Sequence, residues 1–527
     1  GGIGSFTQLG QDIDGAARQD FFGDAISFSS DGSILAVGAA GHSGSRGHVR
    51  IFSYTPSGVS SWTQLGADID GLDTSHYNGH SVSLSSDGLR VAMGAPQYKV
   101  IGQNNNDIGH VRIFDYNGSA WVQVGADIVG KTAGDYFGDS VALSSDGSRV
   151  AIGAPGFSSN FYGGDRRGHV RIYELQSGSW TQLGADIAGE AANDESGSQI
   201  TISSDGLRVA IGAAANDGNG SNSGHVRVYD YNGSAWVQVG ADIDGEAAGD
   251  LCGSGVSLSS DGSILAVGAS SNDGGGTNFG HVRIYKYTPS GVSSWTQLGA
   301  DIDDGNASGD SEAVSLSSDG SRIAIGAKFF NSSRGTTRIY DYNSESDSWT
   351  QFGANIDGEA GGDYSGDALS LSPDGSRVAI GARDNDGTSG DTNDRRGHVR
   401  VYSLKGESYQ YAWDVDSGGA PSDGTYRATI AGADLAGNAY SGTDSITFTV
   451  DSTAPTVTLT DTDSDNLVST SEVVTITAGF SEAMTATPTI SITGIVTNVI
   501  MTPVSGTNSY TYAWDTSSGT LTTGNYA

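Results

Sequence analysis

The chain has 527 residues, of which 61 are acidic and 26 are basic, so its formal net charge is −35 at pH 7. Such an acidic surface excludes nucleic acid as a partner, because phosphate binding needs clustered basic side chains. The single cysteine, Cys252, excludes internal disulfides. The chain opens without an apolar segment, so we expect neither a signal peptide nor a membrane span.

One stretch of sequence recurs seven times. An aromatic-x-Gln triplet marks each copy, and successive markers lie between 54 residues (Trp295 to Trp349) and 59 residues (Trp62 to Trp121) apart. The seven marker residues are Phe6, Trp62, Trp121, Trp180, Trp236, Trp295 and Trp349. A period of this size indicates one supersecondary unit per repeat, whose apolar faces are buried by its neighbours.

Each copy contains four segments with the alternation and the β-branched or aromatic enrichment of strands. In the second copy they are residues 81–85, 90–94, 110–114 and 121–124. An Asp-Gly pair between the first two segments suits a tight hairpin turn. These aspartates are Asp31, Asp87, Asp146, Asp205, Asp261, Asp319 and Asp374. Four antiparallel strands per unit, repeated radially, predict an all-β fold, a seven-bladed β-propeller over residues 1–404.

The two ends of the repeat region predict how the ring closes. An outer-strand segment at residues 6–9 precedes the first blade, whereas the seventh blade ends at Tyr402 without an outer strand. We therefore expect the N-terminal strand to complete blade seven by pairing with residues 399–402.

A histidine begins the third strand in six copies. If the third and fourth strands form a hairpin, counting residues outward from its turn places an aspartate opposite each histidine. The predicted pairs are His48 with Asp68, His110 with Asp127, His169 with Asp186, His225 with Asp242, His281 with Asp301, and His398 with Asp12. The sixth copy has Thr336 with Asn355 opposite, so both partners change together, as cross-strand neighbours would. Equivalent copies around a ring favour a structural role over a metal or acid–base site, both for these pairs and for the arginine two residues after each histidine.

The loops that join the blades are rich in aspartate. The pattern Asp-x-Asp-Gly-x4-Asp occurs at Asp12, Asp14 and Asp20 and again at Asp242, Asp244 and Asp250, and blade seven offers Asn355, Asp357 and Asp363. Hard cations bind several converging oxygens, so these loops are candidate calcium sites. The first aspartate of each loop is also the predicted partner of a histidine.

After about residue 404 the sequence changes character. Glycine becomes rarer, threonine becomes commoner, and Tyr411-Ala-Trp413-Asp recurs 101 residues later as Tyr512-Ala-Trp514-Asp. That spacing suits one β-sandwich domain. Residues 405–452 resemble the back half of a bacterial Ig-like domain, and residues 453–527 resemble the front half of another. Either sequence is missing near residue 405, or the halves complement each other in a permuted way.

The propeller repeats resemble the FG-GAP repeat of integrin α-subunits and their bacterial relatives. Phe22-Gly23 with Gly38-Ala39 carries the resemblance, and Phe137-Gly138 with Gly153-Ala154-Pro155 is the fullest match. The resemblance implies a seven-bladed propeller, an extracellular location, and adhesion or ligand binding. Integrin-type calcium loops place several aspartates in the first hairpin turn. Here that turn holds one, so that calcium site is not carried over.

We predict a secreted or cell-surface protein, a propeller head on an Ig-like stalk that binds a glycan or protein ligand or associates with itself, with calcium as the expected ion. One alternative is a structural subunit of an extracellular filament, and another is a propeller-fold polysaccharide lyase or hydrolase. The repetition leaves no asymmetric catalytic set, and the non-repeat His42, His76 and His80 form no recognisable constellation. We therefore predict that the chain is not an enzyme.

The loops that vary in length emerge on one face of the ring. Repeat proteins bind through the face that carries such insertions, so the mouth of the central channel on that face is the expected ligand site.

Overall fold

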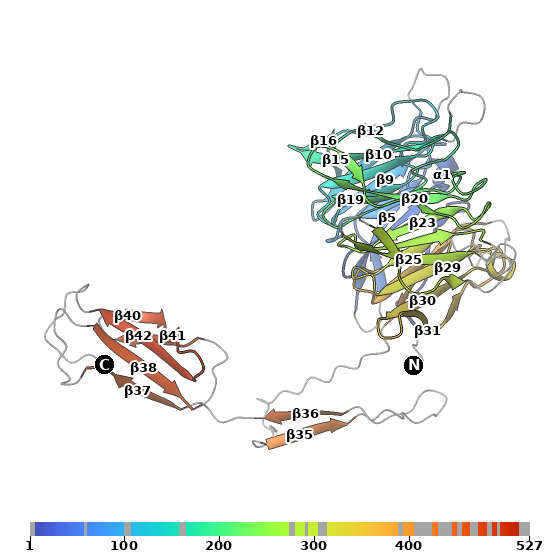
Figure 1. Ribbon diagram of the computed structural model, residues 1–527. Coiled ribbons are helices and arrows are strands. Elements are labelled where there is room, and N and C mark those ends of the chain that lie inside the picture. Colours follow the sequence, from blue (N-terminus) through green and yellow to red (C-terminus); the bar gives the residue numbers. More distant parts are fainter. Residues whose placement is uncertain are drawn as a thin grey trace. The chain divides into compact units, whose positions relative to one another are not determined.

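The computed structural model divides into two compact units, Gly1–Ser408 and Tyr409–Ala527 (Figure 1). In the first unit the structure describes residues 6–56, 61–99, 107–156, 165–272, 280–289, 294–303, 313–387 and 394–404. In the second unit it describes residues 424–429, 445–450, 456–463, 473–481, 487–492 and 496–515. No helix within these ranges is long and apolar enough to cross a membrane.

Seven antiparallel sheets in the first unit are the blades of a β-propeller (Figure 1). The inner strands are β3 (Phe22–Phe28), β8 (Ser81–Leu84), β13 (Val141–Leu143), β18 (Gln199–Ile202), β23 (Cys252–Leu258), β28 (Val314–Leu316) and β32 (Leu369–Leu371). The second strands are β4 (Ile34–Ala39), β9 (Arg90–Ala95), β14 (Arg149–Ala154), β19 (Arg208–Ala213), β24 (Ile264–Ala269), β29 (Arg322–Ala327) and β33 (Arg377–Ala382). The third strands are β5 (His48–Thr55), β10 (His110–Tyr116), β15 (His169–Gln176), β20 (His225–Tyr231), β25 (His281–Thr288), β30 (Thr336–Asn343) and β34 (His398–Ser403).

The outer strands are β6 (Ser61–Gln64), β11 (Trp121–Gln123), β16 (Ser179–Gln182), β21 (Trp236–Gln238), β26 (Ser294–Gln297), β31 (Ser348–Asp357) and, for blade seven, β1 (Thr7–Gln8). The four-stranded blades of the prediction are confirmed. Two single-turn helices, α1 (His42–Ser45) and α2 (Phe330–Ser333), lie in loops between the second and third strands of blades one and six.

A short fifth strand, which the sequence patterns did not predict, follows the outer strand in six blades and pairs with the third strand. These strands are β2 (Ile13–Asp14), β7 (Ile69–Asp70), β12 (Ile128–Val129), β17 (Ile187–Ala188), β22 (Ile243–Asp244) and β27 (Ile302–Asp303), and in blade six the long β31 includes the same segment. The isoleucine that begins each one is buried and anchors the segment to the core.

The N-terminus closes the ring as predicted. β1 pairs antiparallel with β34 of blade seven, with Thr7 opposite Ser403 and Gln8 opposite Tyr402. β2 pairs with the same strand nearer its start. The first residues of the chain therefore supply both the outer strand and the fifth strand of the last blade.

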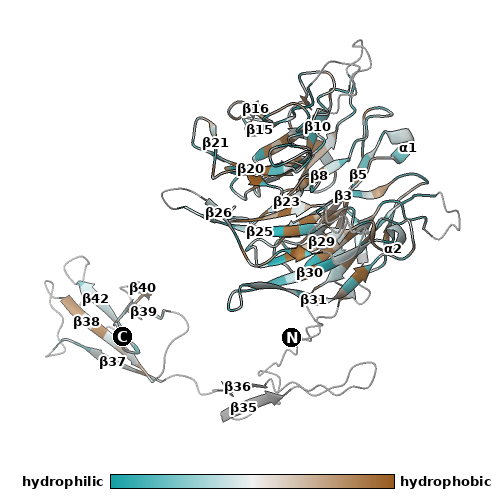
Figure 2. Ribbon diagram, turned by 45° about the vertical axis from the view of Figure 1, so that its right-hand side comes forward, coloured by the Kyte–Doolittle hydropathy of each residue, from teal (hydrophilic) through white to brown (hydrophobic). Residues whose placement is uncertain are grey.

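Apolar side chains fill the spaces between blades, with one cluster at each of the seven junctions. Between blades one and two, Ile51 lies in a cluster with Val91 and Met93. Across the closing junction, Phe22 of blade one lies in a cluster with Val399 of blade seven. In Figure 2 apolar stretches run along strands such as β25 and β29, whereas most connecting loops are hydrophilic.

The recurring glycines let neighbouring blades touch through their backbones. A Cβ added to Gly94 would lie 2.0 Å from the carbonyl oxygen of Gly138 in the next blade. One added to Gly381 would lie 2.3 Å from the carbonyl oxygen of Gly23 across the closing junction. Gly94 and Gly381 belong to the Gly-Ala motif, and Gly23 and Gly138 belong to the Phe-Gly motif. These motif glycines therefore serve blade packing.

The marker tryptophans tie each outer strand to the preceding blade. Their indole N–H groups donate to backbone carbonyls at 2.8–3.1 Å, from Trp62 to Leu9, Trp121 to Leu65, Trp180 to Val124, Trp236 to Leu183, Trp295 to Val239, and Trp349 to Leu298. The marker of blade seven is Phe6, which has no N–H group in its ring. It packs edge to face against Phe352, with ring centroids 5.9 Å apart.

A second series of cross-blade bonds runs around the ring near the Asp-Gly turns. Main-chain N–H groups donate to carbonyls of the next blade at 2.7–2.9 Å, from Ser30 to Ser86, Ser145, Ser204, Ser260, Ser318 and Pro373 in turn. Proline has no N–H group, so Pro373 cannot continue the series to blade one.

In the second unit a four-stranded sheet has the order β37 (Val457–Asp461), β38 (Val473–Phe480), β42 (Ser509–Asp515), β41 (Thr502–Pro503). β39 (Thr489–Ile492) pairs with β40 (Val496–Ile500), and β35 (Gly424–Thr429) pairs with β36 (Ser445–Val450). Val474, Ile492 and Trp514 form a small core. Most of residues 405–452 lie outside the described residues, so the Ig-like assignment and the order of its halves stay predictions.

Deleting residues 1–12 should lower the melting temperature of the propeller. The deletion removes β1, leaves β34 as an open edge, and takes the carbonyl acceptor away from Trp62, at roughly 1 kcal/mol per hydrogen bond. Differential scanning calorimetry measures the change. A chain that ends before Tyr409 is the control for truncation, and an unchanged propeller transition after the N-terminal deletion would contradict this mode of closure.

Candidate functional site

The predicted His–Asp pairs lie at the rim of the propeller, where the third strands begin. In five of them the Nδ1 atom lies 3.4–3.8 Å from a carboxylate oxygen, in His48–Asp68, His110–Asp127, His225–Asp242, His281–Asp301 and His398–Asp12. All five histidines are buried. Burial lowers their pKa values, to about 4 for His48 and about 3 for His110, so the rings are neutral at pH 7.

The predicted register of these pairs is wrong by two residues. His110 lies opposite Val129, because the chain bulges between the outer strand and the fifth strand. Asp127 reaches the histidine from this bulge, where the side-chain amide of Gln123 donates to it at 2.7 Å. The same glutamine bond, to Asp or Asn, occurs in all seven blades and explains the recurring aromatic-x-Gln triplet.

The predicted Thr336–Asn355 pair is also wrong. Thr336 Oγ1 donates to Asp357 at 2.8 Å, and Asp357 is its cross-strand neighbour. Asn355 instead accepts from Gln351 at 2.9 Å. The joint change in blade six therefore does not reflect a contact between the two residues.

In blade three the aspartate is not paired with the histidine, because a lysine lies in the loop that joins blades two and three. Asp186 accepts a hydrogen bond from Arg171 Nε at 2.9 Å, and its Oδ1 lies 3.7 Å from Lys131 Nζ. Within the described ranges no ion pair joins Asp186 to His169. The two cations hold the carboxylate instead.

Most of the arginines that lie two residues after a rim histidine cross to the preceding blade, whereas Arg171 binds Asp186 of its own blade. Five of these arginines donate to backbone carbonyls of the fifth-strand segment there at 2.7–3.0 Å, from Arg50 to Asp14, Arg112 to Asp70, Arg227 to Ala188, Arg283 to Asp244, and Arg400 to Asp357. These are blade-to-blade contacts, which agrees with the structural role that their repetition favours.

The candidate calcium residues have separate partners. Asp20, Asp250 and Asp363 are buried, and each accepts the main-chain N–H of the alanine three residues earlier at 2.7–2.8 Å. Asp14, Asp244 and Asp357 offer their carbonyls to arginines. Asp12, Asp20 and Asp242 belong to clusters in which carboxylate and imidazole atoms converge within 4.8 Å. Calcium binding by these loops stays a prediction.

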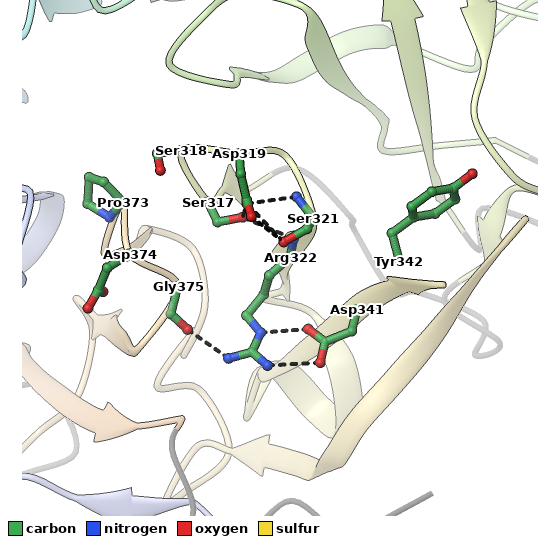
Figure 3. Close-up of a pocket in the computed structure, with 10 residues that line it drawn as sticks. All are labelled: Ser317, Ser318, Asp319, Ser321, Arg322, Asp341, Tyr342, Pro373, Asp374 and Gly375. Carbon is green, nitrogen blue, oxygen red and sulfur yellow. Dashed lines mark hydrogen bonds and ion pairs between the residues drawn. The ribbon is translucent and has the colours of Figure 1, made fainter. Parts of the chain in front are cut away.

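A polar pocket of about 460 Å³ opens on the face of the Asp-Gly turns, between blades six and seven (Figure 3). Arg322 forms a two-point ion pair with Asp341, at 2.6 and 2.8 Å, and donates to the carbonyl of Gly375 at 2.7 Å. The same contacts recur at Arg90 and Arg208. This arrangement is a repeated clip between blades rather than a singular site.

A second cavity, of about 580 Å³, lies at the mouth of the central channel on the face of the variable loops. One apolar residue from each inner strand lines its base, namely Ile26, Val82, Val141, Ile200, Val256, Val314 and Leu369. We call this cavity the cup. Its rim is formed by the residues that follow the Phe-Gly and Gly-Ala positions of the repeat.

One side of the cup carries a continuous chain of ion pairs across five blades. Lys328 Nζ lies 3.0 Å from Asp367, and Asp367 lies 3.0 Å from Arg383. Arg383 lies 2.9 Å from Asp24. His80 continues the chain, with Nδ1 3.5 Å from Asp24 and Nε2 3.5 Å from Asp139. The opposite side, in blades four and five, combines the small side chains Ser198, Ala214, Ser254 and Ser270 with Gln199, Leu251 and Glu195, and Glu195 is paired with Arg166.

His80 is held as an imidazolium. Burial alone would lower its pKa, but hydrogen bonds and charge interactions with Asp139 and Asp24 raise it to about 10. Burial likewise opposes ionisation of Asp24, yet His80 and Arg383 lower the pKa of this carboxyl below its usual value. The side chain of His80 is 38% exposed, so it faces the cup.

Sequence reasoning located the channel mouth and noted His80 as a non-repeat histidine, but it assigned none of these residues to the site. The usable signal is the position after Phe-Gly, which reads Asp24, His80, Asp139, Ser198, Ser254 and Asp367 in the described blades. It varies from blade to blade although its neighbours repeat. His42 and Tyr98, two other non-repeat residues, stack on the rim histidines His48 and His110 with ring centroids 4.0 and 4.1 Å apart.

No protein-family model and no curated protein matches this sequence. Similar solved structures include a putative 6-phosphogluconolactonase from Bacteroides uniformis, with 11% identity over 64% of this chain and 86% of that one, at a TM-score of 0.46. Hydrazine synthase of Kuenenia stuttgartiensis has 14% identity over 71% and 95%, at 0.45. The periplasmic gluconolactonase PpgL of Pseudomonas aeruginosa has 16% identity over 68% and 97%, at 0.44.

The prediction that this chain is not an enzyme has to be corrected. Solved structures with detectable similarity carry the names of enzymes, although their low identities and TM-scores assign no activity to this chain. The premise of the prediction also fails, since the lining of the cup includes an asymmetric set of one histidine, one arginine and several carboxylates.

The stabilising effect of His80 should depend on pH. Its pKa is raised in the folded protein, so its contribution is complete below about 6.5 and is lost as pH rises through about 10. We expect His80→Gln to cost on the order of 1 kcal/mol at pH 6, because solvent in the cup screens the ion pairs, and to cost much less at pH 11. Chemical denaturation across this range measures the difference.

His76→Gln is the matched control. Burial lowers the pKa of His76, so this ring is neutral from pH 8 upward, and its substitution should cost the same at pH 8 and pH 11. A pH-independent cost of His80→Gln would show that His80 is not charged in the folded protein.

Proposed function

We propose that the propeller is a ligand-binding head, that its site is the cup, and that its ligand is a hydroxyl-rich small molecule such as the terminal sugar of a glycan. The observation that supports this proposal is the ion-pair chain from Lys328 to Asp139. It breaks the sevenfold repeat at the one place where all blades meet.

The charges in the cup favour a neutral, polar ligand. Lys328, Arg383 and His80 are matched by Asp367, Asp24 and Asp139, so the chain has no excess charge to offer an ion. Hydroxyl groups can donate to the carboxylates and accept from the cations at the same time. Charge-assisted bonds of this kind are stronger than neutral ones, which gives a sugar ring both affinity and orientation.

The shape of the cup agrees with this ligand class. The apolar base formed by residues such as Val82 and Val256 can pack against the C–H face of a sugar ring. The small side chains of blades four and five leave room beside the charged side. Binding pockets combine an apolar lining with few well-placed polar groups in the same way.

Hydrolysis at the same cup is the second candidate. His80 lies between two carboxylates, and these are the acid–base groups that could move a proton to or from a bound ligand. The protonated ring of His80 is the candidate acid, and Asp139, 3.5 Å from its Nε2, is the candidate base.

The location of the protein, its partners and its calcium dependence are also proposals. The resemblance to FG-GAP repeats supports a secreted or surface-exposed head that meets a glycan or protein, or a second copy of itself in a filament. Calcium dependence would come from the aspartate-rich loops.

A glycan array probed with the full chain, with and without calcium, should reveal ligands whose binding depends on the cup. His80→Gln and Arg383→Gln should each weaken binding about 10-fold or more, because each removes charged hydrogen bonds worth roughly 1.5–3 kcal/mol. Arg322→Gln alters the pocket on the opposite face and should leave affinity unchanged.

Binding that survives both cup substitutions would place the site elsewhere. Mass spectrometry of the bound glycans separates the two candidates. A cleaved product that His80→Gln abolishes, with binding retained, would establish hydrolysis as the function.

A further inference from the structure

Three blade junctions repeat one cluster of potential metal ligands. A rim histidine, the aspartate of the same blade and a glutamate from the loop that enters the blade place one ligand atom each within 4.8 Å of the others. The clusters are Glu190 with His225 and Asp242, Glu246 with His281 and Asp301, and Glu359 with His398 and Asp12.

The ligand atoms face one another without closing the space between them. His225 Nδ1 lies 3.7 Å from Asp242 Oδ2 and 4.0 Å from Glu190 Oε2. His398 Nδ1 lies 3.8 Å from both Asp12 Oδ2 and Glu359 Oε2. These separations exceed a hydrogen bond. Ligands around a tetrahedral zinc ion lie about 3.4 Å apart, given bonds near 2.1 Å, so these histidine-to-carboxylate distances would have to shorten by roughly 0.3–0.6 Å for the ligands to share one ion.

In the blade-four cluster each carboxylate has one oxygen held by a neighbour and the other directed at the gap. Gln238 donates to Oδ1 of Asp242 at 2.6 Å, and Arg227 lies 3.5 Å from Oε1 of Glu190. The Oδ2 and Oε2 atoms are the ones that face His225. Such outer contacts orient ligands in metal sites.

Burial differs from one side of each cluster to the other. The side chains of His225, His281 and His398 are 1–2% exposed, whereas the three glutamates are 46–51% exposed. Each cluster is thus buried on its histidine side and open to solvent on its glutamate side. An imidazole nitrogen with two carboxylates is a donor set that suits zinc and related divalent transition metals.

We propose that these three clusters bind divalent transition metal ions of the zinc class, each through His Nδ1, an aspartate and a glutamate. Zinc is favoured over calcium because the donor set includes a nitrogen and offers few oxygens. The remaining coordination positions face solvent through the half-exposed glutamate.

Three other blades show why, among the described residues, this cluster occurs at three junctions. Lys131 occupies the glutamate position before blade three and draws Asp186 to itself. Ala16 and Leu72 occupy it before blades one and two and supply no ligand atom. In blade one, Asp20 already binds His42 Nδ1 at 2.9 Å, so that cluster is closed by a direct hydrogen bond.

The blade-seven site would act on ring closure. Its three ligands come from the N-terminal segment (Asp12), the loop entering blade seven (Glu359) and the last third strand (His398). A bound ion would therefore clip the first residues of the chain to its last blade. The Leu9 amide, which donates to the Val401 carbonyl at 2.7 Å, lies in the segment that this clip would hold.

The test uses the full chain, stripped with chelator and then titrated with zinc chloride by calorimetry, with metal content checked after dialysis. The wild type should bind three zinc ions. Glu190→Gln, Glu246→Gln and Glu359→Gln should each lose one, and the triple variant should lose all three. Lys131→Gln, at the same loop position, should keep three. The glutamates are half exposed, so these variants should fold, and their unchanged metal-free melting temperatures check this.

Hydrogen exchange adds an independent measure at blade seven. Zinc should slow exchange of the Leu9 amide in the wild type and in Glu190→Gln, but not in Glu359→Gln. No saturable zinc binding, or a triple variant with wild-type stoichiometry, would overturn the proposal. Loss of only one or two sites through their own substitutions would overturn the remaining ones, and equal slowing in Glu359→Gln would overturn the clip.

Discussion

Closure of the ring without a covalent link is the constraint on which the rest of this structure depends. A propeller blade buries its faces only against its neighbours, so an open ring would expose the core between blades seven and one. That junction rests on the pairing of β1 with β34 and on the apolar cluster around Phe22 and Val399. The single cysteine, Cys252, is buried in another junction and cannot contribute a disulfide.

Each of the two series of cross-blade hydrogen bonds lacks one member at blade seven. The serine series stops at Pro373, which has no N–H group to offer blade one. The tryptophan series is interrupted at Phe6, whose ring packs on Phe352 instead of donating a hydrogen bond. The closing junction lacks the serine bond but keeps the indole bond from Trp62 to Leu9, and it depends on strand pairing because no covalent link joins the two ends of the chain. This is where an added clip has the most effect on stability.

Much of the fold could be predicted from the sequence because the packing residues repeat. The glycines at positions such as Gly94 and Gly138 are required by backbone contact between blades, and the strands follow from alternation between turn signals. The predicted strand register was wrong beyond the bulge that precedes Val129, since nothing in the hairpin spacing reveals the two inserted residues. The joint change of Thr336 and Asn355 also led to a wrong pair, because two positions that change in the same blade need not be in contact.

The candidate site escaped prediction because its residues do not repeat. Asp24, His80 and Asp139 occupy one position in three blades, and their meaning appears only when the inner strands converge on the channel. Sequence spacing cannot bring together residues of different blades. A comparison of the copies position by position would have shown that this position varies while its neighbours are constrained by packing.

Acidic side chains are neutralised to different extents in the cup and in the histidine clusters at the rim of the propeller. In the cup, each carboxylate of the ion-pair chain has a cation from the protein itself, so the site is compensated before any ligand arrives. At the rim of blades four and five, burial keeps the histidine neutral, and the nearby arginine pairs with the glutamate but not with the aspartate. That leaves a net negative charge beside the imidazole Nδ1. A compensated polar cup favours neutral hydroxylated ligands, whereas an uncompensated cluster with a nitrogen donor favours a metal cation. The same acidic chain can therefore offer two kinds of site because its repeat fixes the scaffold and leaves the charge partners free to differ.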